Sequence, residues 1–328
     1  MVKFDSLRIF FFSVIKFISL QKVKDYDVML VYTFYTKMYI KGVDVMKQRR
    51  IKDKWTVQYE EMSFPFIQKG WILPSGRYAE FDPFIIMAED WFKRGAFSDH
   101  PHRGFQTITY VVDGRLEHID NSGSRDILEP GDVQYMNAGT GARHAEEAVC
   151  EGIAHTLQLW LNLPSKLKYS NPYYQNVYTE ETPSFEVEGG NIKVFAGTFG
   201  DVEGPLKAMV PITIAEINLE QGASYVHKLP ALHNAFVYML SGEAEIGSEK
   251  TVLKKHQVGL LQTNERIETL DDECPIYARS RRVKILIYSG EPINETIVPY
   301  GPFVMNTEEE IKECYKDYRE GKFGPPAR

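Results

Sequence analysis

Two short strings in the first half of the chain carry side chains well suited to binding a metal ion. His100-Pro101-His102 and His144-Ala145-Glu146 each place two ligand-type residues at positions i and i+2. Alternate side chains of a β-strand share one face, so each string can direct two ligands the same way. If the two strands lie side by side, three imidazoles and one carboxylate converge on one point. This set suits a first-row transition metal, with iron(II) the leading candidate, better than calcium or magnesium, which prefer oxygen ligands alone.

The residues around these strings favour strands and turns. The β-branched and aromatic run 107–112 ends at Asp113-Gly114, which is typical of a hairpin turn. Pro130-Gly131-Asp132 indicates another turn upstream of the second string. The alternative is that these histidines are ordinary polar surface residues, as isolated histidines often are. Their occurrence in paired strings favours the metal site.

From Trp55 onward the pattern is that of an all-β protein. Short β-branched or aromatic runs alternate with Gly, Pro, Asn and Asp at intervals of about ten residues, which predicts a sandwich or barrel. Residues 239–247 parallel 110–118, and this weak internal repeat indicates a duplicated β-barrel. The predicted strands are 84–88, 106–112, 115–119, 132–136 and 155–161 in the first half and 192–196, 212–217, 234–240, 243–247, 257–261 and 283–289 in the second.

The two halves are not chemically equivalent. Where the first half has His100 and His102, the second has His227 and His233, which are six residues apart. Residues 264–275, which match the second string, include acidic residues and a cysteine but no histidine. We therefore expect one metal site per chain, with the three histidines of the second half, His227, His233 and His256, as packing or surface residues.

The C-terminus carries the clearest helix signal. Thr307 followed by three glutamates, with Glu310 at the third helical position, is a capping-box pattern. Gly321 is expected to end the helix. A helix docked onto a barrel is the predicted role of this segment.

Composition and charge narrow the function classes. A length of 328 residues suggests about two domains. Residues 1–54 contain 12 Lys and Arg against 5 Asp, whereas the remainder contains 26 basic and 40 acidic residues. The acidic body argues against direct nucleic-acid binding. The three cysteines are widely spaced and form no disulfide framework, so a reducing, cytoplasmic location is expected.

Residues 1–45 form an N-terminal extension of doubtful meaning. The apolar stretch 7–20 is interrupted by Arg8 and Lys16, so no uninterrupted run approaches the ~20 residues of a membrane span. A membrane-surface tail is the alternative, because the extension is basic and aromatic.

Six strings, in order along residues 60–324, resemble those of the pirin family, the two-barrel (bicupin) members of the cupin superfamily. The strings are His-Pro-His-Arg-Gly-Phe (100–105), Leu-Glu-Pro-Gly-Asp-Val-Gln-Tyr-Met (128–136), His-Ala-Glu-Glu (144–147), Leu-Gln-Leu-Trp-Leu-Asn-Leu-Pro (157–164), His-Asn-Ala-Phe-Val-Tyr (233–238) and Gly-Pro-Phe-Val-Met-Asn-Thr (301–307). The resemblance implies two tandem cupin barrels of the double-stranded β-helix or jelly-roll type, with a short C-terminal helix. The expected organisation is a metal-binding N-terminal cupin at 55–163, a linker or structured crossover at 164–190, and a C-terminal cupin without a metal site at 191–324.

The resemblance also implies a ligand set and an activity. One Fe(2+) per chain would be held by His100, His102, His144 and Glu146, while Gln106 stands where general cupins carry a glutamate. Pirins with quercetinase activity suggest a dioxygenase that takes a small aromatic substrate and O2, opens the heterocyclic ring of a flavonol and releases carbon monoxide. Glu146 would then be a catalytic residue that also accepts the substrate hydroxyl proton, or a purely structural ligand. The alternative function is a non-catalytic, redox-sensitive regulator that binds a transcription factor or metabolic enzyme.

Further residues are candidates for the surroundings of the metal. Phe105, Gln106, Met136 and Trp160 either line an aromatic-accepting cleft or belong to the core. Arg103 and Asp99 are expected to support the metal-bound imidazoles, because such rings usually donate their other N–H to an acceptor. His155 is expected either to join that support or to be a hydrogen-bonded core histidine.

Overall fold

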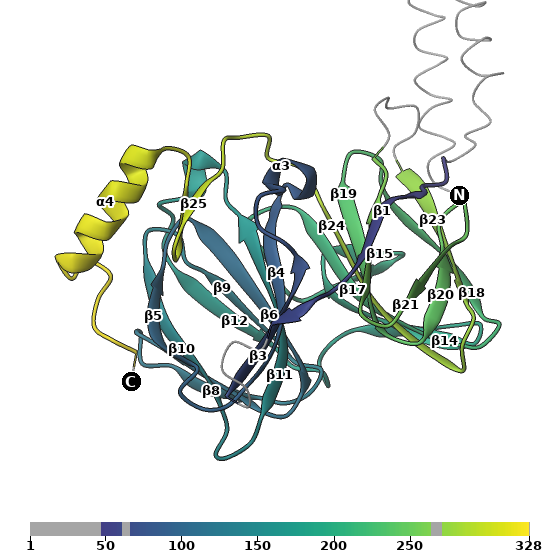
Figure 1. Ribbon diagram of the computed structural model, residues 1–328, viewed down its shortest axis with the longest axis horizontal. Coiled ribbons are helices and arrows are strands. Elements are labelled where there is room, and N and C mark those ends of the chain that lie inside the picture. Colours follow the sequence, from purple (N-terminus) through teal and green to yellow (C-terminus); the bar gives the residue numbers. More distant parts are fainter. Residues whose placement is uncertain (1–46, 61–65, 264–270, 328) are drawn as a thin grey trace, which may run out of the picture. The chain divides into compact units, whose positions relative to one another are not determined.

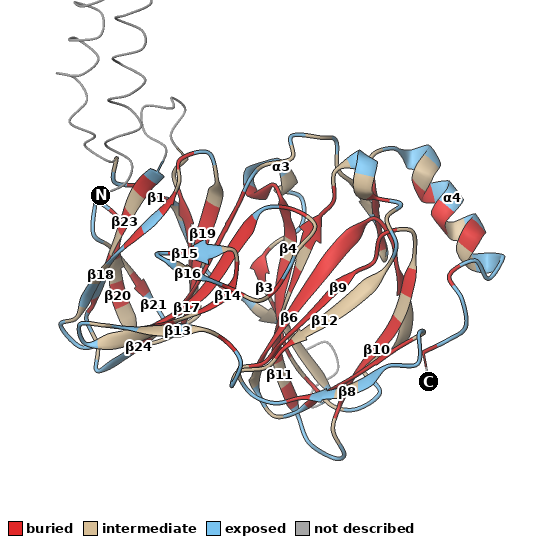
Figure 2. Cartoon of the chain, turned by 180° about the vertical axis from the view of Figure 1, so that it is seen from behind, coloured by how far each residue is buried: buried red, intermediate tan, exposed pale blue. Residues whose placement is uncertain are grey.

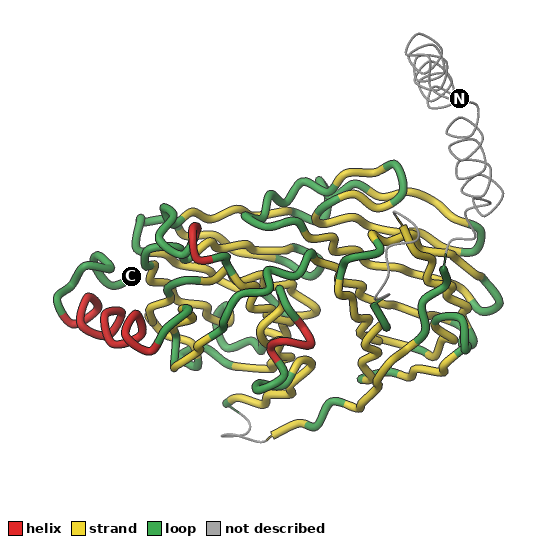
Figure 3. The backbone as a smooth tube through the Cα atoms, turned by 90° about the horizontal axis from the view of Figure 1, so that it is seen from above, coloured by secondary structure: helices red, strands yellow, loops and turns green. Residues whose placement is uncertain are grey.

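Strands form nearly all of the regular structure of the protein (Figure 1, Figure 3). The computed structural model describes residues 47–60, 66–263 and 271–327. The expectations for residues 1–45, and those for 264–270, lie outside the described residues. Within them, the prediction of an all-β fold with one short C-terminal helix is confirmed.

The first barrel combines a seven-stranded and a four-stranded antiparallel sheet. The order is β12-β9-β6-β11-β4-β3-β2 in the larger sheet and β5-β10-β7-β8 in the smaller. The strands are β2 (Tyr59–Glu60), β3 (Ile67–Leu73), β4 (Phe84–Phe92), β5 (Phe97–His102), β6 (Phe105–Asp113), β7 (Leu116–Asp120), β8 (Arg125–Leu128), β9 (Val133–Asn137), β10 (Ala142–Ala148), β11 (Ala154–Asn162) and β12 (Tyr173–Val177).

The second barrel repeats this plan. Its larger sheet has the order β1-β22-β19-β24-β17-β14-β13, and its smaller sheet β18-β23-β20-β21. The strands are β1 (Ile51–Thr56), β13 (Ser184–Val187), β14 (Gly190–Ala196), β17 (Ile212–Glu220), β18 (Ser224–Pro230), β19 (Asn234–Ser241), β20 (Glu243–Ile246), β21 (Thr251–Lys254), β22 (Gln257–Leu261), β23 (Asp271–Ala278) and β24 (Arg282–Gly290), and β15 (Thr198–Phe199) pairs with β16 (Val202–Glu203). β1 precedes the first barrel in sequence but pairs with β22 of the second.

Residues 164–190, the expected linker or crossover, contain regular structure. They include a 3-10 turn, η1 (Ser165–Leu167), and then β12 and β13, each of which adds an edge strand to a different barrel. Lys168 is buried and donates hydrogen bonds to the backbone oxygens of Gly104 and Val304 and to Oδ1 of Asn162. This segment therefore fastens to the first barrel before it passes to the second.

Strand alternation explains how the two barrels pack. On β11, Leu157, Leu159 and Leu161 belong to the large core cluster shared by the facing seven-stranded sheets, together with Phe236 and Tyr288 of the second barrel. The intervening residues of β11 face the inside of the first barrel, where some line a cavity. Figure 2 shows buried residues along the strands of the two seven-stranded sheets.

One buried carboxylate lies where the two barrels meet. Glu89 of β4 accepts hydrogen bonds from the hydroxyls of Tyr59 and Tyr238, and its other oxygen lies 2.8 Å from Nε2 of His155. Nδ1 of His256 lies 2.6 Å from the Tyr59 hydroxyl. We call these five residues the Glu89 cluster; it joins side chains from both barrels through hydrogen bonds.

The interiors of the two barrels differ in polarity. The core cluster of the second barrel is mostly aliphatic, built from residues such as Ile217, Val237 and Ile285, although His227, Asp272 and Arg49 are also buried there. The first barrel instead buries polar side chains such as Thr109 and Gln134. Because a buried polar group needs a partner, the first barrel is the one equipped to hold a ligand or an ion.

The C-terminal segment (298–327) packs on the first barrel. It consists of β25 (Val298–Tyr300), β26 (Phe303–Met305), helix α4 (Glu308–Arg319) and a tail. The predicted capping box of Thr307 and Glu310 is present at the start of α4. Asp317 of α4 forms a buried ion pair with Arg103 at 2.9 Å. None of the helices in the described part of the chain combines the length and the apolar character needed to cross a membrane.

The predicted strands are all present, with ends shifted by a few residues. The short helix α3 (Tyr78–Phe81) has no signal in the sequence analysis. It makes less than two turns and carries no side-chain cap, so local sequence patterns of the kind used above do not mark it.

Candidate metal centre

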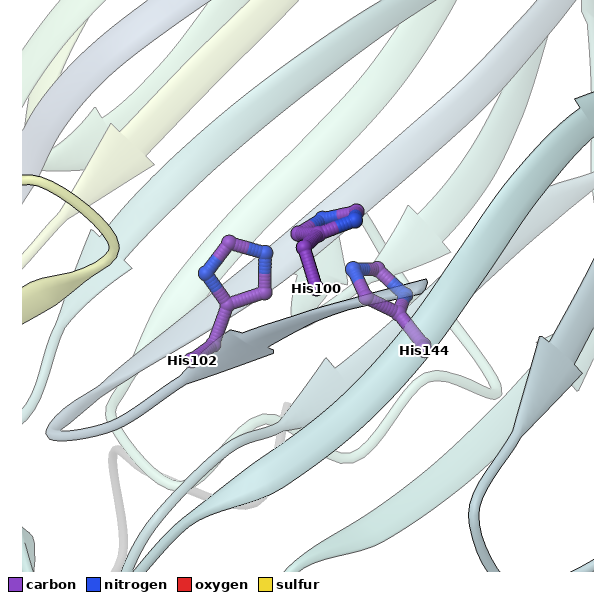
Figure 4. A group of neighbouring side chains, drawn as sticks. All are labelled: His100, His102 and His144. Carbon is purple, nitrogen blue, oxygen red and sulfur yellow. The ribbon is translucent and has the colours of Figure 1, made fainter. Parts of the chain in front are cut away.

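Two neighbouring strands bring three histidines together. His100 and His102 lie on β5, His144 lies on β10, and the antiparallel register places His144 directly opposite His100. One ring nitrogen from each lies within 4.8 Å of the others, and the ring centroids are 4.5–5.0 Å apart. Figure 4 shows the three rings gathered over these strands. Strand alternation and cross-strand pairing together produce the convergence that the sequence predicts.

Each imidazole is oriented through its Nδ1 atom. Nδ1 of His100 lies 2.8 Å from the carbonyl oxygen of Ser98, and Nδ1 of His102 lies 3.4 Å from that of Pro302. Nδ1 of His144 lies 3.2 Å from Nε2 of His118. Because a carbonyl oxygen can only accept, the first two rings carry their proton on Nδ1 and keep a lone pair on Nε2.

The Nε2 atoms have the character expected of metal ligands. Nε2 of His102 and Nε2 of His144 are buried and have no hydrogen-bond partner. Buried polar atoms without a partner are rare, and an ion at this point would satisfy both. Nδ1 bonded to an acceptor and Nε2 left free is the usual arrangement of a metal-binding histidine.

Electrostatics keep His102 and His144 neutral. Burial, together with the neighbouring histidines, lowers the pKa of His102 and His144 well below the ordinary value. Burial also lowers the pKa of His118 to about 4. Since neutral imidazole is the form that binds a metal, the site does not need to lose a proton from these rings to accept one.

Glu146, the fourth predicted ligand, lies in the same cavity but outside the group of three. Thr109 Oγ1 donates to its Oε1 at 2.8 Å, and Gln158 Nε2 donates to its Oε2. Burial raises the pKa of Glu146, and the bonds from Thr109 and Gln158 oppose that rise. The carboxylate is thus held beside the imidazoles by two strands of the larger sheet.

The side chains of this centre line a cavity of about 260 Å³. His100, His102 and Glu146 contribute to its wall together with Gly301 and Pro302 of the C-terminal segment. Ten further residues line the cavity, six of them aromatic or apolar and four polar or charged. The apolar ones are Trp71, Ile86, Ala88, Phe92, Phe97 and Trp160, and the polar ones are Lys69, Asp90, Thr156 and Gln158. Burial raises the pKa of Asp90 to about 7, against the opposing effect of Lys69. The cavity therefore offers aromatic walls and a polar centre to a small ligand.

Of the four residues considered as cleft-lining, Trp160 lines the cavity. Phe105, Gln106 and Met136 are buried and do not line it. Gln106 faces the other way, where its amide donates to the backbone oxygen of Asn162.

The expectation that Arg103 and Asp99 support the metal-binding imidazoles is wrong. Arg103 bonds to Asp317 and to the backbone oxygen of Thr140, while Asp99 pairs with Arg143. Among the described residues the imidazoles are supported instead by two backbone carbonyls and by His118. His155 is a hydrogen-bonded core histidine in the Glu89 cluster.

His118 is the functional residue that the sequence analysis missed. It lies on β7, which pairs with β10, and Gln134 Nε2 lies 3.2 Å from its Nε2. Its sequence signal was the polar spacing His118-Ile119-Asp120 inside a strand, the same i, i+2 pattern that marks the two ligand strings. Because its partner His144 lies 26 residues away, only the pairing of the strands reveals its role.

We expect His118→Phe to weaken metal binding without unfolding the protein. The variant removes the partner of His144 Nδ1, and loss of such a partner typically raises a metal dissociation constant about 10–100-fold. Competition with a chromogenic chelator would measure the change. His227→Phe is the matched control, because His227 is equally buried but stacks on Phe199 in the second barrel. Equal affinities in the two variants would contradict the role of His118.

The three-histidine group is the one cluster of its kind found within residues 47–60, 66–263 and 271–327. In the second barrel His227 is buried with both ring nitrogens unpartnered, whereas His233 lies between β18 and β19 and His256 between β21 and β22. These three histidines do not converge on each other.

Comparisons with known proteins agree with this architecture. The family described as Pirin matches residues 72–161, and that described as Pirin C-terminal cupin domain matches residues 214–324. A pirin-like protein of Solanum lycopersicum is 36% identical over 245 residues, which cover 74% of this chain and 82% of that protein. A crystal structure of a Geobacillus kaustophilus protein is 39% identical with a TM-score of 0.74, covering 76% of this chain and 99% of that one.

A second solved structure bears on chemistry. It is a quercetin 2,3-dioxygenase from Acinetobacter baumannii, 29% identical with a TM-score of 0.73, covering 84% of this chain and 98% of that one. With the matched domains on both barrels and relatives similar over most of their length, this two-barrel cupin chain belongs to the pirin family.

Proposed function

We propose that this protein is a metal-dependent dioxygenase that uses O2 to open the heterocyclic ring of quercetin-like flavonols. The observation that carries the proposal is the cavity that reaches His100 and His102 of the three-histidine group, and Glu146, between aromatic walls. The similarity to a quercetin 2,3-dioxygenase of Acinetobacter baumannii supports the same activity.

We propose Fe(2+), one per chain, bound by His100, His102, His144 and Glu146. Nitrogen-rich sets with one carboxylate suit a redox-active first-row metal. Three neutral imidazoles and one carboxylate would leave a single positive charge on a ferrous site, which favours an anionic oxygen from the substrate. When bound, the ion supplies Lewis acidity toward that oxygen and a one-electron couple for the chemistry of O2.

The residues of the chain bind and prepare the substrate. Glu146 is the proposed catalytic residue, which accepts the proton of the flavonol 3-hydroxyl. Hydrogen bonds from Thr109 and Gln158 hold its carboxylate in the cavity, where it can accept that proton. Trp71, Phe97 and Trp160 offer apolar surface to a flat aromatic ligand and exclude water from its reacting end. The cavity, about 260 Å³, is slightly smaller than the ~300–1,000 Å³ range of ligand pockets, so it suits a single small aromatic molecule.

Iron loading without oxygen, followed by quercetin and O2, tests the proposal. We expect quercetin to disappear with one O2 consumed and one carbon monoxide released per molecule. Protein loaded with Zn(2+), which cannot change oxidation state, is the matched control and should leave quercetin intact. Fully iron-occupied protein that neither consumes quercetin nor releases carbon monoxide would reject the proposal.

A redox-dependent regulator is the function to consider if that test fails. Ferrous and ferric protein should then bind a protein partner with different affinity. The free state of Cys150, Cys274 and Cys314 supports a reducing, cytoplasmic location for either function.

A further inference from the structure

The cavity contains a second polar group that the metal centre does not use. Lys69 of β3 and Asp90 of β4 are directly opposite each other in the antiparallel pair, and both line the cavity. The register of β4 with β11 pairs Ala88 with Gln158, the residue bonded to Glu146. Asp90 is two residues further along β4, which corresponds to roughly 7 Å along the strand.

This pair is close but not joined by a hydrogen bond. Lys69 Nζ lies 3.7 Å from Asp90 Oδ1, which is beyond hydrogen-bond range. Asp90 is only 4% exposed, and its Oδ1 is buried without a hydrogen-bond partner. An acceptor buried in this way is costly unless something donates to it. The missing donor points to a ligand in the cavity.

The surroundings of Lys69 indicate what that ligand carries. Its ammonium lies 5.0 Å from the ring centroid of Trp71 and 5.4 Å from that of Phe97. These contacts hold the cation beside aromatic surface and leave its protons free to donate. An aromatic hydroxyl satisfies both groups at once, because its O–H donates to Asp90 while its oxygen accepts from Lys69. Its ring would rest against Trp71 and Phe97.

We propose that Lys69 and Asp90 form a subsite for a phenolic hydroxyl at a distance from the metal-binding end of the substrate. The inference rests on the proposed function and narrows its substrate class. The protein would select flavonols that carry both the oxygen pair of the 3-hydroxyl and 4-carbonyl groups and a hydroxyl elsewhere on the rings. The competing explanation is that Lys69 and Asp90 are an ordinary cross-strand ion pair. Such a pair would form a direct hydrogen bond, and it would give the protein no preference for one flavonol over another.

Anaerobic binding tests the subsite without turnover. Iron-loaded protein is titrated with quercetin and with 3-hydroxyflavone, which keeps the metal-binding oxygens but lacks the other hydroxyls. We expect quercetin to bind at least about tenfold more tightly, as a hydrogen bond to a charged group predicts. In Asp90→Leu and Lys69→Met this ratio should fall to about one through loss of quercetin affinity, with 3-hydroxyflavone affinity unchanged.

Two further variants keep the test decisive. Asp90→Asn retains an oxygen acceptor with little change in volume, so it should keep part of the preference and also serve if Asp90→Leu does not fold. Lys284→Met is the matched control, because Lys284 pairs with Glu216 of the second barrel at 3.1 Å and does not line the cavity. It should preserve the ratio.

The outcomes separate the two proposals. Metal-dependent binding of both flavonols with equal affinity, or an unchanged ratio in Asp90→Leu, Asp90→Asn and Lys69→Met alike, overturns the subsite and leaves the proposed function standing. No metal-dependent binding of either flavonol overturns both.

Discussion

Replacing His102 with alanine will yield a folded protein that no longer retains its metal. The ring directs Nε2 to the metal centre, and the three-histidine group contains no further described residue that could supply a ligand atom in its place. Loss of a mere supporting partner costs about 10–100-fold in metal affinity, so loss of a direct ligand should cost more than ~100-fold. Metal analysis after dialysis should therefore show nearly one ion per chain in the unmodified protein and less than about one-tenth of that in the variant.

The fold should survive because the ring contributes little to it. Its hydrogen bond to the Pro302 carbonyl is long, at 3.4 Å, and its packing is limited to rings such as Phe105 and Trp160. Circular dichroism and thermal melting of the two metal-free proteins should therefore nearly coincide. His233→Ala, a change in the second barrel, is the matched control and should keep its metal. Full metal retention by His102→Ala, or its global unfolding, would contradict the assigned role.

Replacing Glu89 with alanine should produce a large loss of stability without touching the metal centre. Glu89 is fully buried and accepts from Tyr59 and Tyr238 while lying 2.8 Å from His155 Nε2. Its removal leaves these partners buried and unpaired, and the loss of one member of a buried charged network costs about 3–5 kcal/mol. Urea denaturation of the metal-free protein would measure the loss in the free energy of unfolding.

The conservative variant Glu89→Gln separates volume from charge. It fills the same space and keeps one oxygen acceptor, so it should lose less stability than Glu89→Ala. Burial acts to raise the pKa of Glu89. The hydrogen bonds from His155, Tyr238 and Tyr59 outweigh burial and leave this pKa below its ordinary value of 4.5. A carboxylate whose pKa is lowered by folding stabilises the folded protein when the pH is above its ordinary pKa. This stabilisation is lost as the pH falls below the ordinary pKa. The stability difference between the unmodified protein and Glu89→Gln should therefore shrink in acid below about pH 4.5. A difference that is constant with pH would count against an ionised Glu89.

Local sequence patterns predicted those features that depend only on residues close together in the sequence. His100 and His102 could be placed on one face because a strand alternates with a period of two. The Thr307 capping box was equally visible, since all its partners lie within four residues. The same reasoning located eleven strands of the two barrels, because β-branched runs and turn residues mark their ends. It did not predict others, such as β3, β18 and β23.

Features that depend on strand pairing could not be found in this way. The contact of His118 with His144 requires β7 beside β10, and the juxtaposition of Lys69 and Asp90 requires the register of β3 with β4. Arg103, expected beside the imidazoles, reaches instead to Asp317, 214 residues away. A charged side chain takes the partner that the tertiary fold brings near, and the neighbouring sequence does not specify that partner.

The C-terminal segment has a consequence for how the protein matures in a cell. Gly301 and Pro302 line the cavity, the Pro302 carbonyl faces His102, and Ala327 donates its backbone N–H to Asp99 beside His100. Ribosomes deliver a chain from its N-terminus, and early domains generally fold first. A nascent chain can thus close its first barrel while the pocket still lacks one wall. The wall of the cavity beside His102 is therefore complete only after Gly301 and Pro302 have docked on the first barrel.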